Sequence, residues 1–253
     1  MDFASQFNAF WRLFYTNGGY KRVFSEGLKN TLVIAIMGLI IGIVIGTIIA
    51  AVKVMPKYKI FPKIIDKICS LYVALFRGTP IIVQLIVFHF VIMDAISLNM
   101  DTTTQAIIIF GLNSGAYVSE IMRGGINSVD KGQLEAGRAV GLGYWTTMLK
   151  IVLPQAIKNI VPTLGNEFIA LMKDTSVVNI IAADDLYRAF VSMGGFSMRY
   201  YVPYLMLALS YFVLILFVTL LVKIVEHIMS KSDRRTASNK KNSKNLVKGD
   251  ANG

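Results

Sequence analysis

Long apolar runs alternate with short polar segments over most of this 253-residue chain. A helix that crosses a membrane needs about 20 consecutive, mostly apolar residues. Five runs approach or exceed that length, at residues 31–54, 64–93, 104–122, 159–182 and 202–225. The pattern predicts an all-α, polytopic membrane protein with about five transmembrane helices.

The second run is too long for one upright crossing, because about 30 residues in a helix extend about 45 Å. It contains the sequence FRGTP at residues 76–80. Proline removes a backbone donor and clashes with the preceding turn, so we expect the helix to be broken at this point rather than to continue as a smooth rod.

Composition and charge support a membrane protein and give its orientation. Apolar residues make up 55% of the chain and charged residues 16%, against about 25% charged in soluble domains. The net charge of +11 lies in alternate loops and in the tail instead of on one face, so we expect no nucleic-acid partner. The positive-inside rule places the N-terminus outside and the C-terminus in the cytoplasm.

The same features divide the chain into three parts. Residues 1–30 form an extracytoplasmic segment, amphipathic over 7–24, and residues 31–228 form a single transmembrane domain. Residues 229–253 form a basic cytoplasmic tail with little apolar content, which we expect to be disordered. The N-terminal segment lacks a signal-peptide pattern, so we expect the first span to be retained.

Residues 134–155, LEAGRAVGLGYWTTMLKIVLPQ, are too polar to span a bilayer, yet they are regularly patterned. As helix, an apolar face opposes Glu135 and Arg138, and Gly141 permits a turn before the next apolar stretch. Two short amphipathic helices near 129–153, joined at a glycine, would make a convex knob that suits a groove on a soluble partner.

This stretch resembles the EAA loop of permease subunits of bacterial ABC importers, at the same spacing. Its positions are Glu135, Ala136, Gly137, Gly141, Ile151, Leu153 and Pro154, with Gly137 where the family often has alanine. Three further segments, LFRGTPIIVQL (75–85), NSGAYVSEIMRGGINSV (113–129) and LGNEFIALMKDTSVV (164–178), resemble the polar amino-acid permeases. The resemblance extends from about residue 26 to 225.

The resemblance implies a type I-like permease fold in a bacterial cytoplasmic membrane and a transport subunit that is not itself an enzyme. It implies that the EAA segment forms coupling helices in a cleft of an ATPase dimer. The coupling residues would be Glu135, Ala136, Gly137, Arg138, Gly141, Leu153 and Pro154. The chain contains no phosphate loop, so ATP and Mg²⁺ would belong to the ATPase and this chain would bind no cofactor. Further partners would be a second permease subunit, identical or sister, an extracytoplasmic amino-acid-binding protein, and lipid.

Ionisable residues at membrane depth are costly and should face protein or water. Glu167 and Asp174 are seven residues apart and share one helix face, while Asn166 and Lys173 form a neighbouring stripe. Two carboxylates with one amine match a zwitterionic amino acid with a basic side chain. An internal ion pair of Lys173 is the alternative, and Arg77 could balance the second carboxylate. The candidate substrate path comprises Glu167, Lys173, Asp174, Asn166, Arg77 and Thr79.

Other features predict structure instead of chemistry. Gly38, Gly42, Gly46 and Ala50 form a ridge for close helix packing, which could lie at a dimer seam. Glu120, one turn before Arg123, is interpreted as structural. His89 and His227 are far apart in the sequence, so no metal site is expected.

The sequence therefore favours the permease subunit of an ATP-driven importer that moves a polar amino acid, with arginine, lysine or histidine preferred. Glutamine and cystine are alternative substrates. A stand-alone secondary transporter would need repeated broken helices, and a membrane enzyme would need a nucleophile with a base or a metal cluster. Neither pattern is found in the sequence.

Overall fold

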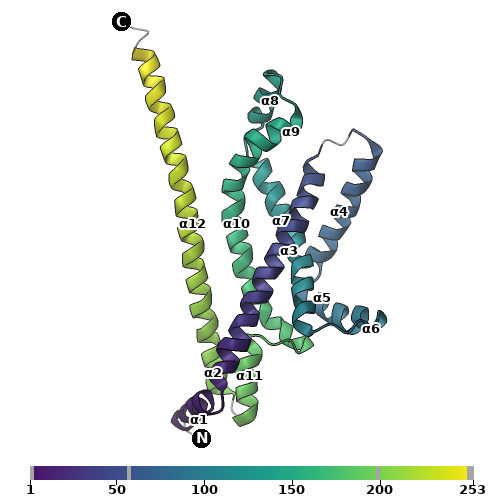
Figure 1. Cartoon of the computed structure of the whole chain (residues 1–253), viewed down its shortest axis with the longest axis vertical. Helices are drawn as coiled ribbons and strands as arrows, with labels where there is room; N and C mark the ends of the chain where they lie inside the picture. Colours follow the sequence, from purple (N-terminus) through teal and green to yellow (C-terminus); the bar gives the residue numbers. More distant parts are fainter. Residues whose placement is uncertain (1–2, 56–57, 198–199, 250–253) are drawn as a thin grey trace.

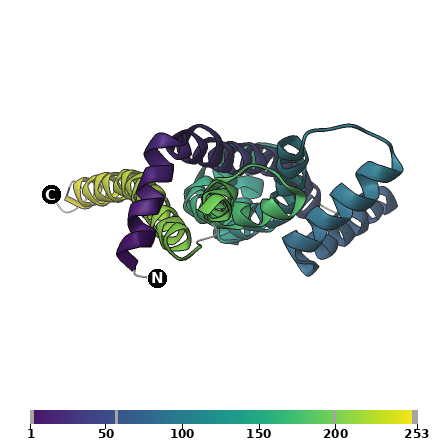
Figure 2. The ribbon, with the colours of Figure 1, turned by 90° about the horizontal axis from the view of Figure 1, so that it is seen from below.

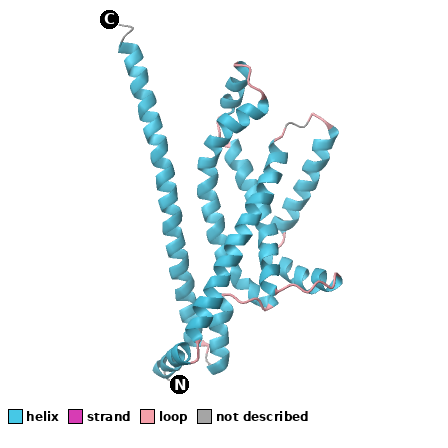
Figure 3. Ribbon diagram, in the orientation of Figure 1, coloured by secondary structure: helices cyan, strands magenta, loops and turns pink. Residues whose placement is uncertain are grey.

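The structure is a computed structural model that describes residues 3–55, 58–197 and 200–249, and their side chains as far as Met229, apart from Ser197. Within these ranges the backbone forms helices joined by short loops and contains no β-strand (Figures 1 and 3). The all-α class predicted from the sequence is confirmed.

The helices follow one another along the chain with few long connections, and several begin where the preceding one ends. Their bounds are α1 Phe3–Thr16, α2 Gly19–Lys21, η1 Arg22–Leu28, α3 Lys29–Val54, α4 Ile60–Gly78, α5 Ile81–Val87, η2 Phe88–Ile92, α6 Met93–Ala95, α7 Thr102–Asn127, α8 Lys131–Ala139, α9 Tyr144–Thr147, η3 Met148–Val152, α10 Leu153–Asp174, η4 Thr175–Ile181, α11 Leu186–Ser197 and α12 Tyr201–Gly249.

Two of the described helical runs, Gly19–Val54 and Tyr201–Met229, are each long and apolar enough to cross a membrane. The pair Ile60–Gly78 and Ile81–Ala95 qualifies together, but it is bent by 104°. The predicted break at FRGTP is thus confirmed. Helices α7 and α10 contain 26 and 22 residues, which is enough length for a span, but they carry more polar residues. The count of five crossings stays a prediction.

Helices α3 and α7 pack with their backbones in close approach along the predicted glycine ridge. A Cβ atom added at Gly42 would lie 2.5 Å from Ser114 Oγ, and one at Gly46 would lie 2.7 Å from a Val118 methyl carbon. The fit is reciprocal, because a Cβ at Gly111 would lie 2.5 Å from Ile41 Cγ2. The ridge therefore packs inside the chain and does not form the dimer seam that the sequence also allowed.

The break between α4 and α5 is held by a polar network that replaces the lost helical hydrogen bonds. The buried side chain of Gln84 donates to the carbonyl oxygens of Phe76, at 2.8 Å, and Thr79, at 3.0 Å. Asn113 of α7 donates to Gln84 Oε1 at 3.0 Å. The carbonyls freed by Pro80 are therefore satisfied within the protein, as a break at membrane depth requires.

The two ends of the chain differ from the sequence prediction in detail. Gly18, with φ of +71°, makes a corner, so the helical run that contains the first span begins at Gly19 rather than at residue 31. At the other end α12 continues to Gly249, where the composition predicted a disordered tail. An existing helix extends at little cost through residues such as Lys, Arg and Ala, which favour helix.

Helix α11 is fixed by a buried polar cluster at the end of the bundle opposite α8 and α9 (Figure 1). Asp185 is fully buried and caps α11, since its carboxylate accepts from the backbone N–H of Arg188 at 2.8 Å and of Tyr187 at 3.1 Å. Tyr211 of α12 donates to the same carboxylate at 3.3 Å. Thr31 of α3 accepts from the Leu186 N–H at 3.1 Å, so the cluster joins three helices.

Candidate functional site

Helices α8 and α9 with the turn between them, residues 131–147, form the predicted knob, which projects at one end of the molecule (Figure 1). Asp130 caps the start of α8 by accepting from the Gly132 N–H at 2.9 Å. At its end Leu142 N donates to Gly137 O at 2.9 Å and Gly141 N donates to Arg138 O at 3.0 Å. This Schellman pattern needs a left-handed residue, and Gly141 supplies it with φ of +82°.

Gly137 has a packing role that spacing alone did not show. The residue is buried, and a Cβ atom added to it would lie 2.4 Å from Thr147 Cγ2 and 2.6 Å from Thr147 Oγ1. Glycine in place of the alanine of the resembled motif is therefore more than an exchange of small residues. It lets α8 and α9 approach closely and makes the knob a compact unit.

The convex surface of the knob is exposed and largely apolar. Val140 is 75% exposed, Trp145 is 47% exposed and Leu142 is also exposed, as is Leu149 of η3, which follows the knob. The side chains of Glu135, Ala136 and Arg138 are also exposed, and Glu135 and Arg138 line a cavity between the knob and the ends of α3 and α7, with Lys53 and Arg123. Leu153 and Pro154 begin α10 directly after η3, so the knob is continuous with a long helix of the bundle. An exposed apolar patch with charged residues at its edge is typical of a protein-binding surface.

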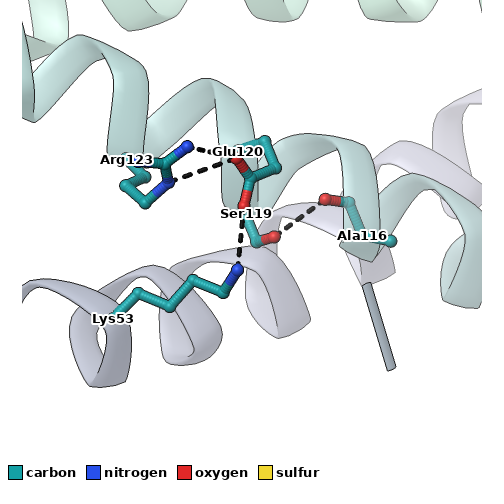
Figure 4. Close-up of polar contacts among 5 residues, drawn as sticks. All are labelled: Lys53, Ala116, Ser119, Glu120 and Arg123. Carbon is teal, nitrogen blue, oxygen red and sulfur yellow. Dashed lines mark hydrogen bonds and ion pairs between the residues drawn. The ribbon is translucent and has the colours of Figure 1, made fainter. Parts of the chain in front are cut away.

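The hydroxyl of Tyr144 ties the knob to the end of α3 by donating to the Val54 carbonyl at 2.7 Å. Next to it, Lys53 Nζ lies 2.9 Å from Glu120 Oε1, and Arg123 approaches Glu120 Oε2 at 2.6 Å (Figure 4). This ion cluster ties α3 to α7. It agrees with the structural role that the sequence predicted for Glu120.

The predicted substrate-path residues that belong to α10 lie on two sides of that helix, whereas Arg77 and Thr79 lie at the end of α4. Glu167 is half-buried, and its carboxyl group lies near the Ser114 side chain of α7 without a hydrogen bond to it. Lys173, by contrast, lines a cavity of about 600 Å³ with Tyr187 of α11 and residues of α12 such as Tyr204. The structure therefore places the amine of Lys173 toward α12 and the carboxylate of Glu167 toward α7.

No hydrogen bond or ion pair within 4.0 Å joins Glu167, Lys173, Asp174 and Arg77 to one another in the part of the chain that the structure describes. Lys173 and Asp174, adjacent in sequence, interact through their charges only. The guanidinium of Arg77 instead lies over the Tyr117 ring, 5.3 Å from its centroid. Asn166 is exposed, and the Thr79 hydroxyl donates to the Leu75 carbonyl at 2.8 Å.

Three residues that shape these sites were not singled out from the sequence: Gln84, Asn113 and Tyr144. Gln84 and Asn113 lie in the recognised segments 75–85 and 113–129, but their partnership joins residues 29 positions apart. Tyr144 and its acceptor Val54 are 90 positions apart. Only polarity within an apolar segment could have drawn attention to Gln84 and Asn113.

Comparison with known proteins agrees with this architecture. Residues 42–231 match the family described as "Binding-protein-dependent transport system inner membrane component". The chain is 38% identical to the arginine transport system permease protein ArtQ of Bacillus subtilis over 208 residues, which cover 82% of this chain and 93% of that one. It is 39% identical to a putative glutamine transport system permease protein GlnP of Rickettsia typhi over 160 residues, covering 63% and 73%.

A solved structure shares the fold. The crystal structure of an amino acid ABC transporter with histidines aligns with a TM-score of 0.76 at 34% identity, covering 90% of this chain and 98% of that one. Matched length, identity and fold lead to one conclusion. The chain belongs to the family of inner membrane components of binding-protein-dependent transport systems, among which its relatives are amino-acid transport permeases.

Proposed function

We propose that this chain is the permease subunit of an ATP-driven importer that moves a polar amino acid into the cytoplasm by alternating access. As a member of its family it is a multi-pass protein of the inner membrane. The single observation that carries the coupling proposal is the knob, whose exposed face stands clear of the helices that support it. In the proposed topology five helices cross the membrane, with the N-terminus outside and the knob and C-terminus inside.

The knob is proposed to bind a cleft of a separate ATPase subunit, which holds ATP and Mg²⁺. Three features support this role. Its apolar tip around Val140 is exposed, its internal packing at Gly137 is tight, and it continues through η3 into α10 without an intervening loop. A compact unit fixed to a long helix can pass a displacement of the ATPase to the membrane domain without deforming.

The proposed substrate is an amino acid with a basic side chain. Glu167 and Asp174 supply two carboxylates against the single amine of Lys173. Arg77 could have balanced the second carboxylate, but its guanidinium lies over Tyr117 and forms no ion pair with either acid. The carboxylate surplus that favours arginine, lysine or histidine is therefore supported. Glutamine and cystine are the alternatives. Of the two relatives named above, one is named for the transport of arginine, which is basic, and the other for glutamine, which is neutral.

The working complex is proposed to contain two permease subunits, identical or sister, two ATPase subunits and an extracytoplasmic binding protein. Five crossings are too few to enclose a path that opens alternately to either side. A two-fold axis normal to the membrane would double the number of helices around the path.

Co-purification tests the coupling proposal. The tagged chain is purified from its own membranes beside Val140→Asp, and co-purifying proteins are identified by mass. We expect the native chain to retain an ATPase and Val140→Asp to lose most of it, because a charge would be placed in an apolar contact. Tyr58→Asp is the matched control: Tyr58 is 84% exposed but lies outside the knob. If the native chain brings down no ATPase, a stand-alone transporter replaces the importer.

Uptake into vesicles that contain the whole complex tests the substrate class. Labelled arginine is imported with unlabelled lysine, histidine, glutamine or cystine as competitors. We expect the basic amino acids to compete best, and Glu167→Gln to reduce uptake of arginine more than uptake of any neutral amino acid. Better competition by glutamine or cystine would contradict the basic preference while leaving the importer proposal intact.

A further inference from the structure

Helix α1 carries a continuous ladder of aromatic rings along one side. Phe3 and Phe7 have ring centroids 6.0 Å apart, Phe7 and Trp11 5.9 Å, and Trp11 and Tyr15 5.6 Å. These four residues recur every fourth position, so they advance slowly around the helix and form one stripe. We refer to Phe3, Phe7, Trp11 and Tyr15 as the aromatic ladder.

Three of the four ladder residues are open, whereas Trp11 is partly buried and packs against the core cluster that contains Phe10 and Phe190. Phe10, on the side of α1 next to the ladder, is 3% exposed and stacks on Phe190 of α11. This side of α1 therefore packs into the core. The ladder residues Phe3, Phe7 and Tyr15 are 52%, 38% and 66% exposed. One aromatic side of α1 is thus buried in the core, while most of a second aromatic side is exposed and not covered by the described residues.

The position of α1 indicates what covers this surface. Its last turn leads through the Gly18 corner into the helical run Gly19–Val54, and Phe3 contacts Tyr201 at the start of α12, with ring centroids 6.0 Å apart. Helix α1 therefore bridges the same ends of the two runs that are apolar enough to span a membrane, and it lies across them (Figure 2). The ends of spanning helices lie at the boundary between acyl chains and headgroups.

The chemistry of α1 fits that boundary. Tryptophan and tyrosine are enriched there because each has an apolar ring and a polar group. Helix α1 contains no acidic residue, and Arg12 is its only charge. An amphipathic helix with aromatic residues on one side and a base on another is typical of a segment that lies in the plane of the membrane.

We propose that the aromatic ladder of α1 is a lipid-binding surface that inserts at the acyl-chain and headgroup boundary and holds the starts of the helical run Gly19–Val54 and of α12 near that depth. Helix α1 would then lie between lipid on its ladder side and α11 on its Phe10 side. The proposal is independent of the transported substrate and of which membrane face carries α1.

The two tryptophans of the chain provide the test and its control. Trp145→Phe leaves Trp11 on the ladder, and Trp11→Phe leaves Trp145 on the knob, which is 47% exposed. Each full-length variant is reconstituted into phosphatidylcholine and phosphatidylglycerol vesicles whose lipids carry bromine at a shallow or a deep position of the acyl chain. Bromine quenches tryptophan emission only within short range, so the loss of emission reports depth.

We expect the partly buried Trp11 to lose several-fold more of its emission than Trp145, and more with shallow than with deep bromines, while Trp145 loses little with either. Equal, weak quenching of both tryptophans would overturn the proposal, since the ladder would then face water. Protection of Trp11 from quenching, or a shift of its emission, when the purified extracytoplasmic binding protein is added would overturn it too and would identify a protein as the occupant. Stronger quenching by deep than by shallow bromines would place α1 within the acyl chains and contradict an interfacial position.

Discussion

Asp185 offers a measurable consequence of burying a carboxyl group in this fold. It lies between the predicted fourth and fifth spans and is fully buried, in contact with Tyr187, Arg188 and Tyr211. Burial raises the pKa of Asp185 from 3.8 to about 6, although the hydrogen bonds that its carboxylate accepts act in the opposite direction. Asp184, which forms an ion pair with Arg188 at 3.1 Å, raises the pKa further.

The sign of the effect follows from linkage. Because the folded pKa of Asp185 lies above its unfolded value, the folded state binds this proton more tightly. The resulting stabilisation is complete below about pH 4 and is lost as the pH rises through about 6. A difference of about two pKa units corresponds to about 3 kcal/mol in total. Between about pH 5 and 7.5 the unfolded group is already ionised, so only about 1.4 kcal/mol of that total is lost in this window.

The assay is thermal unfolding of the purified chain in detergent between about pH 5 and 7.5, beside Asp185→Asn. For a chain of this length 1.4 kcal/mol corresponds to a shift of the melting temperature of about 3–6 °C. We expect the native chain to lose that much more than the variant as pH rises, because asparagine can still accept one cap hydrogen bond but cannot ionise. Other titrating groups, including the two histidines, contribute equally to both proteins.

Parallel melting curves for the native chain and Asp185→Asn would refute the reasoning, because they would mean that ionisation of Asp185 costs nothing in the folded state. A steeper loss in the variant would refute it more strongly. Asp185→Ala separates the cap from the charge, since it leaves the N–H groups of Tyr187 and Arg188 without their acceptor. We expect the unfolding free energy of that variant to be about 1–3 kcal/mol lower than that of the native chain, and its melting temperature to be lower, even at about pH 5.

Two further predictions concern the packing of α3 against α7 and are also measured by thermal unfolding. Gly42→Ala should lower the unfolding free energy by about 1–3 kcal/mol, since the new Cβ atom would meet Ser114 Oγ at 2.5 Å. Gly124→Ala is the control: nothing lies within 4 Å of its new Cβ atom, so it should be neutral or stabilise by up to about 1 kcal/mol. Equal losses in the two variants would contradict the close packing of α3 on α7 at Gly42. Glu120→Ala should cost up to about 3 kcal/mol because it leaves both Lys53 and Arg123 unpaired. Lys53→Met should lower the unfolding free energy less than Glu120→Ala does, because Glu120 keeps its ion pair with Arg123. A larger loss in Lys53→Met would show that Lys53 contributes more to stability than Glu120.

The sequence predicted those parts of the fold that depend on local pattern. The break at FRGTP, the glycine ridge of α3 and the two short helices of the knob each follow from a pattern within one continuous segment of at most about 25 residues. The continuation of α12 to Gly249 was not predicted, because composition describes a segment in isolation and not the helix that precedes it.

Long-range polar contacts could not be predicted in the same way. Thr31 and Leu186, joined by a hydrogen bond, are 155 positions apart. Thr31 appears in the sequence as a single polar residue at the start of an apolar run, and its partner is a backbone N–H that every residue except proline carries, so nothing local identifies the pair. The candidate path shows the same limit, since the spacing of Glu167 and Lys173 could not show that one faces α7 and the other α12.

Glycines illustrate where local pattern stops being informative, because this chain uses them for two different physical purposes. Gly137 and Gly141 lie four residues apart in one motif. At Gly137 the backbone conformation suits any residue, but the space is filled by Thr147; at Gly141 the space is open, but φ is +82°. Alanine at Gly137 would therefore separate α8 from α9, whereas alanine at Gly141 would strain the turn that sets the direction of the chain. The EAA spacing marks both positions equally, and only the three-dimensional contacts distinguish a residue that sets the thickness of the knob from one that sets its shape.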